Sequence, residues 1–234
     1  MKKFLSISII IRSLPYLLKY SYSYFHKTAL ESSLSPAEIT VSARILPAAI
    51  LKIIPLPLRG TVIPALSPKL PVPVVYNCGG YERPETLKQL EGKVDIYLPD
   101  LKYAEARLAK PLSAAIDYFP RAKNAIREMF RQVGPVQWEG SKVVKGVIIR
   151  HLILPGHVDN SLKVLDWIGN TFAPGEVLVS LMRQYTPMGG LPAPLDRRVT
   201  DEEYDAVLSW MYLNDLEGFT QEDDSASTAF IPDF

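Results

Sequence analysis

The chain has 234 residues, of which 47% are hydrophobic and 22% charged, and this balance excludes a wholly disordered chain, a collagen and a coiled-coil rod. Its 26 basic and 25 acidic residues give a net charge of +1, which creates no strong field toward nucleic acid or an anionic membrane. The single cysteine, Cys78, excludes an intramolecular disulfide and any multi-cysteine metal site built from this chain.

Residues 1–70 differ in composition from the rest of the chain. They contain nine basic and two acidic residues, a net charge of +7, whereas residues 71–234 carry −6. Five prolines interrupt the apolar stretch 43–70, and no regular element is predicted there because proline ends helices and central strands. We interpret residues 1–70 as a segment that is either disordered or translated from a frame that was not selected for folding.

The start of this segment allows two further interpretations. Lys2 and Lys3 precede the apolar residues 4–11, which is the pattern of a weak signal peptide or of an amphipathic segment on a membrane surface. Arg12 then interrupts the run, and no stretch reaches the roughly 18 apolar residues that a bilayer-spanning helix needs. We therefore expect a cytoplasmic protein without a nucleic acid or membrane partner.

After Pro71, short apolar strands alternate with amphipathic helices. Strands are predicted over 73–77, 94–98, 143–154 and 177–182, and helices over 84–91, 120–133, 159–172 and 201–213. Thr200 and Glu203 form a capping box at the start of the last helix. This order indicates an α/β fold with a parallel sheet and right-handed crossovers, in which ligands bind at the carboxyl ends of the strands.

Polar residues follow the first two predicted strands. The first strand ends in Asn77 and Cys78 before two glycines, which is either a ligand-binding turn or a plain strand-to-helix turn. The second is followed by Asp100 and Lys102, which alternate with Leu101 and so point to one face. This pair could hold ribose hydroxyls or a carboxylate, or it could be a surface ion pair worth under about 1 kcal/mol.

The third predicted strand carries Arg150 and His151 in an otherwise apolar run. A buried cation is costly unless it is paired, so if Arg150 faces the cleft we expect an anionic ligand or Asp100 as its partner. His151 would then face the helices as a hydrogen-bonded core residue rather than a catalyst. The fourth strand leads into a polar loop with Gln184 and Tyr185, either a ligand-binding loop or an ordinary connection.

Other chemistries lack their sequence motifs. The chain has no G-x-G-x-x-G, no P-loop, no G-x-S-x-G and no H-E-x-x-H. Its three histidines are too widely spaced for a zinc site. Cys78 as a nucleophile would need a base beside it, such as His151 or His157.

Five blocks of the sequence resemble one protein family. They are PVVYNCGGYERPETLKQLEGKVDIYLPDLKY, RAKNAIREMFRQVG, GVIIRHLILPGHVDNSLKVLDWI, LVSLMRQYTPMGG and RRVTDEEYDAV. Their content and order resemble the radical S-adenosylmethionine (SAM) iron–sulfur proteins similar to pyruvate formate-lyase activating enzymes. The resemblance implies a partial (β/α) barrel over about residues 71–216, with its first strands missing or replaced, and an acidic tail over 217–234.

The resemblance also implies an activity and its partners. Such proteins use a [4Fe–4S] cluster and an electron donor to cleave SAM, and the 5′-deoxyadenosyl radical abstracts hydrogen from a substrate, which for an activase is a glycyl-radical enzyme. Matching positions imply SAM contacts at eight residues. These are Asn77, Cys78, Asp100, Lys102, Arg150, Leu152, Gln184 and Tyr185.

One departure from the family pattern concerns the cluster. The family binds it through C-x-x-x-C-x-x-C on the first strand's loop, because thiolates are the soft, anionic ligands of iron–sulfur clusters. Residues 1–70 contain no cysteine, so no metal ligand is assigned. Two hypotheses follow: a radical SAM enzyme that is inactive in the form written, or a non-catalytic remnant that binds a nucleotide-like ligand or a protein partner.

Overall fold

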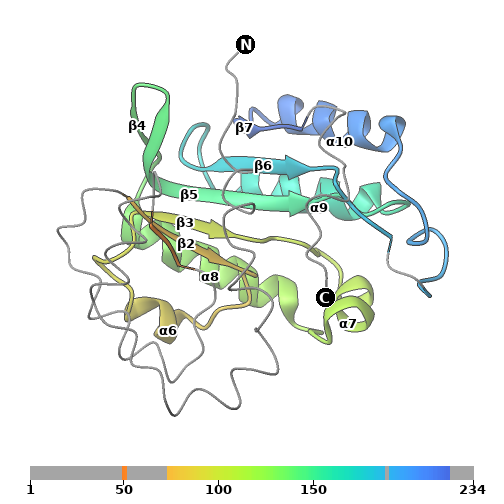
Figure 1. Ribbon diagram of the computed structural model, residues 1–234, viewed down its shortest axis with the longest axis horizontal. Helices are drawn as coiled ribbons and strands as arrows, with labels where there is room; N and C mark the ends of the chain where they lie inside the picture. Colours follow the sequence, from red (N-terminus) through yellow and green to blue (C-terminus); the bar gives the residue numbers. More distant parts are fainter. Residues whose placement is uncertain (1–48, 52–72, 188–189, 222–234) are drawn as a thin grey trace. The chain divides into compact units, whose positions relative to one another are not determined.

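The computed structural model describes residues 49–51, 73–187 and 190–221 (Figure 1). They belong to one compact unit that spans Ala48–Ala226. The interpretation of residues 1–70 lies outside the described residues except at 49–51, and so does most of the tail 217–234.

The described strands form one mainly parallel sheet. Its order is β1-β2-β3-β5-β6-β7, and each neighbouring pair along this path is parallel, while β4 pairs antiparallel with β5. The strands are β1 (Ala49–Leu51), β2 (Val74–Cys78), β3 (Ile96–Pro99), β4 (Gln137–Glu139), β5 (Lys142–Leu152), β6 (Leu178–Met182) and β7 (Gly218–Phe219).

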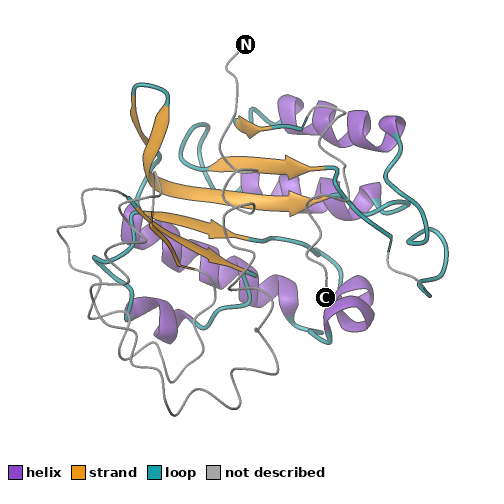
Figure 2. Cartoon of the chain, viewed as in Figure 1, coloured by secondary structure: helices purple, strands orange, loops and turns teal. Residues whose placement is uncertain are grey.

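Helices connect the parallel strands from β2 onward, and two of them, α8 and α9, lie behind the sheet in the view of Figure 2. The described helices are α6 (Pro84–Lys88), α7 (Ala106–Ser113), α8 (Tyr118–Val133), α9 (Val158–Gly169) and α10 (Asp201–Leu213). α10 packs on α9, and α6 packs on α8. None of these helices combines the length and the apolar character needed to cross a bilayer.

The core lies between the sheet and helices α8 and α9. Alternate residues in the central parts of β3 and β5, namely Tyr97, Val147 and Ile149, point toward the helices and are fully buried. Facing them is an apolar helix surface of Ala122, Ala125, Ile126, Met129, Val164, Leu165 and Ile168. Burying each larger side chain contributes roughly 1.5–3 kcal/mol, so this layer fixes the sheet against the helices.

The predicted α/β architecture with a parallel sheet is confirmed. β2, β3, β5 and β6 and helices α6, α8, α9 and α10 all overlap the ranges predicted from the sequence. α10 begins and ends where predicted, and its capping box is present: Glu203 N donates to Thr200 Oγ1 at 3.3 Å, and Thr200 N donates to Glu203 Oε2 at 3.0 Å.

Four elements were not predicted, and each has a local reason. β1 lies in the stretch 43–70, where prolines predict no regular element, yet three residues fit between Pro47 and Pro55. The helical pattern of α7 is hidden by Pro111 in its interior. β4 and β7 have only three and two residues, which is too short to show a period.

Candidate ligand-binding site

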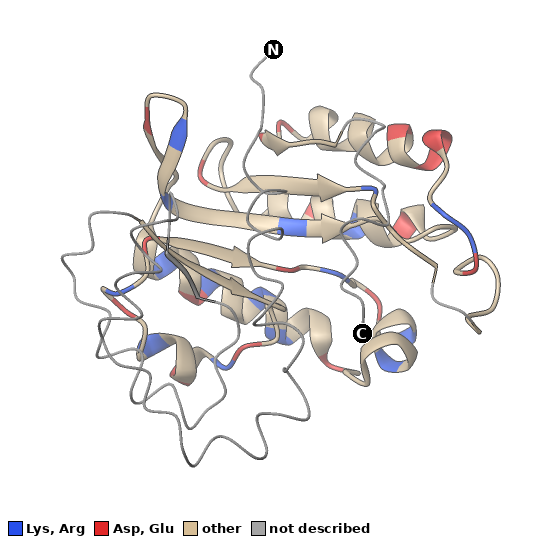
Figure 3. Cartoon of the chain, viewed as in Figure 1, with Lys and Arg blue, Asp and Glu red and all other residues tan. Residues whose placement is uncertain are grey.

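Three charged side chains meet at the carboxyl ends of β3 and β5. Arg150 Nη2 lies 2.5 Å from Asp100 Oδ1, and Lys102 Nζ lies 3.3 Å from Asp100 Oδ2. Figure 3 shows acidic and basic positions on the segment after β3, beside a basic position on β5. The expected pairing of Arg150 with Asp100 is therefore confirmed.

The sheet register places further polar residues on the same face. Asp100 forms a parallel bridge with Arg150, and Arg150 is opposite Ser180 on β6. On β2, Asn77 is opposite Leu98, which is two residues before Asp100 and so shares its face. This face points away from α8 and α9, and we call Asp100, Lys102 and Arg150 the charged cluster.

The charged cluster carries one positive charge in excess, because one carboxylate faces two cations. Lys102 is 40% exposed, whereas Arg150 and Asp100 are 23% and 14% exposed. Arg150 Nε and Asp100 Oδ1 are buried and have no hydrogen-bond partner among the described residues, so the 2.5 Å ion pair between Arg150 Nη2 and Asp100 Oδ1 is not an aligned hydrogen bond. An unsatisfied buried donor costs about 1–3 kcal/mol, and the exposed part of the Arg150 side chain remains open to an anionic ligand.

Cys78 lies on the opposite face from Asn77. Its side chain is 2% exposed, and burial raises the pKa of its thiol to about 12. The thiol is therefore protonated at neutral pH and does not act as a nucleophile there. The main chain of Cys78 touches the site, because its carbonyl oxygen accepts a hydrogen bond from Asp100 N at 3.0 Å.

A [4Fe–4S] cluster does not fit the residues of this chain. The family pattern needs three thiolates, and the sequence has one cysteine, which is buried and protonated. The described residues also contain no group of three His, Cys, Asp or Glu side chains arranged to hold a metal ion.

Three further residues are implied by the family resemblance: Leu152 follows Arg150 on β5, and Gln184 and Tyr185 follow the end of β6. Leu152 shares the face of Arg150 and is opposite Met182. Gln184 Nε2 lies 3.9 Å from Met182 Sδ. Tyr185 donates a hydrogen bond from its hydroxyl to Leu195 O at 2.8 Å, so this side chain holds the loop that leads to α10.

Residues behind the charged cluster were missed by the sequence analysis. Tyr118 and Asn160 hydrogen-bond the main chain of the segment that follows β3, although they lie 16 to 58 residues away along the chain. No spacing or motif connects residues that far apart, so only the tertiary structure identifies them.

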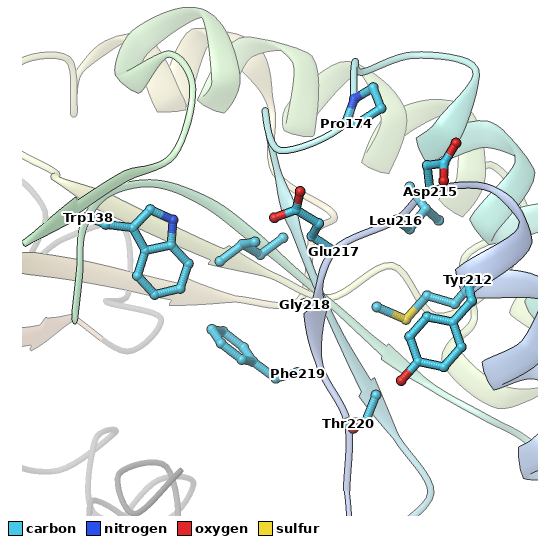
Figure 4. A pocket seen from close by; sticks show the side chains of 11 residues that line it. Trp138, Pro174, Tyr212, Asp215, Leu216, Glu217, Gly218, Phe219 and Thr220 are labelled. Carbon is cyan, nitrogen blue, oxygen red and sulfur yellow. The ribbon is translucent and has the colours of Figure 1, made fainter. Parts of the chain in front are cut away.

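A cavity of about 620 Å³ lies elsewhere, beside the edge strand β7. Trp138 and Phe219 lie on one side of β7 and Tyr212 on the other (Figure 4). Asp215 and Glu217 also line this cavity, but no residue of the charged cluster does. The aromatic side chains that line this cavity are divided between the two sides of β7. We therefore place the candidate site at the charged cluster, where paired and unsatisfied polar groups converge.

Comparisons with known proteins identify the fold. No family model matches the chain. Over 142 residues it is 30% identical to the uncharacterized protein MJ0674 of Methanocaldococcus jannaschii, an alignment that covers 58% of this chain and 37% of that protein. The chain thus matches little more than a third of the length of this distant archaeal homologue.

A solved structure gives the class of fold. The chain resembles a domain of a pyruvate-formate lyase-activating enzyme from Bacteroides vulgatus, with a TM-score of 0.55 and 11% sequence identity. The match covers 74% of this chain and 99% of that domain. At this identity the likeness establishes a shared α/β fold, and the chemistry has to be argued from the residues.

Proposed function

We propose that the chain binds SAM, or a closely related adenosyl compound, at the charged cluster, and that it does so without an iron–sulfur cluster. The observation that carries the proposal is the convergence of Asp100, Lys102 and Arg150 at the carboxyl ends of two parallel strands. Ligands of parallel α/β folds bind at this edge of the sheet.

The donors and acceptors of the charged cluster match the polar groups of SAM. A carboxylate of the ligand would pair with the partly exposed Arg150 side chain and lie near Lys102, where one positive charge is in excess. Asp100 accepts hydrogen bonds from hydroxyl groups such as those of a ribose. Bound SAM supplies a sulfonium centre, and the role of these residues is to bind and orient it.

Isothermal titration of the full chain with SAM and with S-adenosylhomocysteine tests the proposal. We expect binding by the wild type and a loss of about tenfold or more for Arg150→Met and Asp100→Asn, since hydrogen bonds to charged groups are worth about 1.5–3 kcal/mol. Arg131→Met is the matched control, because Arg131 forms ion pairs with Glu91 and Glu128 outside the cluster. The proposal is wrong if the wild type binds neither compound or if Arg150→Met binds as tightly as Arg131→Met.

A second candidate function is radical generation at a [4Fe–4S] cluster, with a protein substrate and an electron donor. The fold resemblance favours it, but it needs three thiolates that this chain lacks. Anaerobic reconstitution with iron and sulfide, followed by iron analysis and a test for 5′-deoxyadenosine on reduction, separates the two candidates. Sequencing the transcript upstream of the Pro71 codon tests for an in-frame C-x-x-x-C-x-x-C: its presence would support this second candidate, and a transcript that encodes residues 1–70 as written would contradict it.

A further inference from the structure

The segment Asp100–Ala104, which we call the exit segment, leaves β3 and carries two of the three residues of the charged cluster. Its main chain is bonded by side chains from β5, α8 and α9. His151 Nδ1 lies 2.6 Å from Leu101 O, Asn160 Nδ2 donates to Lys102 O at 3.0 Å, and Ala104 N donates to Asn160 Oδ1 at 2.8 Å. Lys102 N donates to the Tyr118 hydroxyl at 3.1 Å.

The hydrogen bonds of His151 define its tautomer. Leu101 O can only accept, so Nδ1 carries the proton, and Nε2 then accepts from the Ser161 hydroxyl at 2.8 Å. Both His151 and Ser161 are fully buried, which favours the neutral ring. His151 thus holds the main chain next to Asp100 in one fixed orientation.

At this point β5 presents contacting side chains on both faces of the sheet. Arg150 points to the ligand face and pairs with Asp100, while the next residue, His151, points to the helix face and binds Leu101. In addition, Leu101 N donates to Arg150 O at 2.8 Å. Two successive residues of one strand therefore hold two successive residues of the exit segment.

The turn after β2 is fitted closely against the same segment. Tyr118 donates its one hydroxyl proton between Asp100 O at 2.9 Å and Gly79 O at 3.0 Å. Gly80 has φ +79°, and a Cβ there would lie 2.0 Å from Asp100 O. The exits of β2 and β3 are thus joined at the point where a ligand would bind.

We propose that His151 and Asn160 are positioning residues that hold the exit segment so that Asp100 and Lys102 face Arg150. A purely stabilising core would be built from apolar side chains here, because burying polar groups costs free energy unless every one is satisfied. Here all the polar groups of His151, Asn160 and Ser161 that face the segment have partners. The effect on ligand affinity rests on the proposed function, whereas the effect on the exit segment does not.

Hydrogen exchange of the ligand-free full chain tests the positioning directly. Asn160→Leu removes the acceptor of Ala104 N, and His151→Leu removes the donor to Leu101 O, whereas Tyr118 still binds Lys102 N. Because the segment is then held less tightly, we expect the Ala104 amide in Asn160→Leu and the Lys102 amide in both variants to exchange about tenfold faster or more. His151→Asn retains a donor near the position of Nδ1 and should restore most of the protection. Unchanged protection in both leucine variants would overturn the proposal.

SAM affinity supplies the second readout and separates positioning from general stability. We expect His151→Leu and Asn160→Leu to raise the Kd for SAM about fivefold or more at a temperature where each variant is folded. Trp210→Phe is the matched control, because it removes a hydrogen bond of 2.7 Å to Asp166 between α10 and α9, away from the exit segment. This control should lower the Tm without changing the Kd.

The two readouts can fail independently. If the wild type binds no adenosyl compound while the leucine variants still lose amide protection, the proposed function fails and the positioning of the exit segment stands. If the wild type binds SAM and both leucine variants bind it equally well with protected amides, the positioning proposal fails and the proposed function stands.

Discussion

Arg150 and His151 show how neighbouring residues of one strand reach different environments. Arg150 is partly exposed beside Asp100, whereas His151 has no exposed surface and lies against α9. Because strand side chains alternate, the charge stays at the ligand face and the neutral ring enters the core. The sequence predicts this division correctly, since one cation within an apolar strand has to face a partner.

The burial of His151 predicts a pH dependence of stability. Desolvation lowers the pKa of His151 from 6.5 to about 4 in the folded chain, so the unfolded chain binds a proton first as the pH falls. The free energy of unfolding is therefore highest above about pH 6.5 and is lost progressively toward pH 4, by up to about 3 kcal/mol. Urea unfolding between pH 7.5 and 4.5 measures this loss.

His151→Asn is the variant that assigns this pH effect, because it removes the titrating ring. Its stability should vary less than that of the wild type between pH 6.5 and 4.5. The carboxylates of Glu128 and Glu203 have pKa values lowered to about 2 by their arginine partners, so their contribution is lost mainly below about pH 4.5. Equal slopes for the two chains above pH 4.5 would show that His151 is not the group responsible.

At the scale of the element, the start of α10 depends on Glu203 more than on its capping partner. Glu203 completes the capping box with Thr200, and its Oε1 also accepts from Gly156 N at 2.6 Å and pairs with Arg197 at 2.7 Å. It therefore ties the helix to the turn between β5 and α9. The capping box alone can be seen in the sequence, whereas the bonds to Gly156 cannot.

Substitutions at these two positions should differ in cost. Thr200→Ala removes one cap and should lower the free energy of unfolding by about 1 kcal/mol. Glu203→Ala also leaves Gly156 N without its acceptor, so we expect a loss of about 2 kcal/mol. Urea denaturation at pH 7 measures both values. A larger loss for Thr200→Ala than for Glu203→Ala would contradict this account of the helix start.

The sequence predicts long, periodic elements and misses short or distant features. β2, β3, β5, β6 and α10 follow from apolar periods and caps, whereas β7 and β1 are too short to leave a period. For the site, alternation predicts that Asp100 and Lys102 share a face, and the cost of burying an unpaired cation makes Asp100 one expected partner of Arg150. The bonds from Tyr118 and Asn160 could not be predicted, because they depend on how α8 and α9 pack on the sheet.

At the scale of the whole molecule, the fold resembles that of an activating-enzyme domain, whereas the residues lack the ligands of an iron–sulfur cluster. The fold resembles a domain of a pyruvate-formate lyase-activating enzyme over 74% of the chain. The residues provide a polar strand-end site but only one cysteine, which is buried with a protonated thiol. A shared scaffold does not fix the reaction, so binding without the iron–sulfur cluster is a proposal that rests on the residues of the charged cluster and not on the fold.

The sheet also depends on a strand from the part of the sequence with an unusual composition. β1 pairs with β2 through Ala49↔Val74, Ile50↔Val75 and Leu51↔Tyr76. A chain that begins at residue 73 lacks this partner and leaves the edge of β2 unpaired, and an unpaired edge invites pairing with other molecules. We expect such a chain to self-associate and to unfold without a single cooperative transition.

Light scattering and thermal unfolding of two truncated chains measure the contribution of β1. The first chain begins at residue 73, and the second begins at residue 48 and so keeps the pairing of β1 with β2. We expect the longer chain to self-associate less and to unfold cooperatively, because β1 covers β2 and, with three residues, is itself a shorter edge strand than the five-residue β2. A monodisperse, cooperative chain beginning at residue 73 would show that β2 does not need a covered edge, and the sheet would then be complete from β2 to β7.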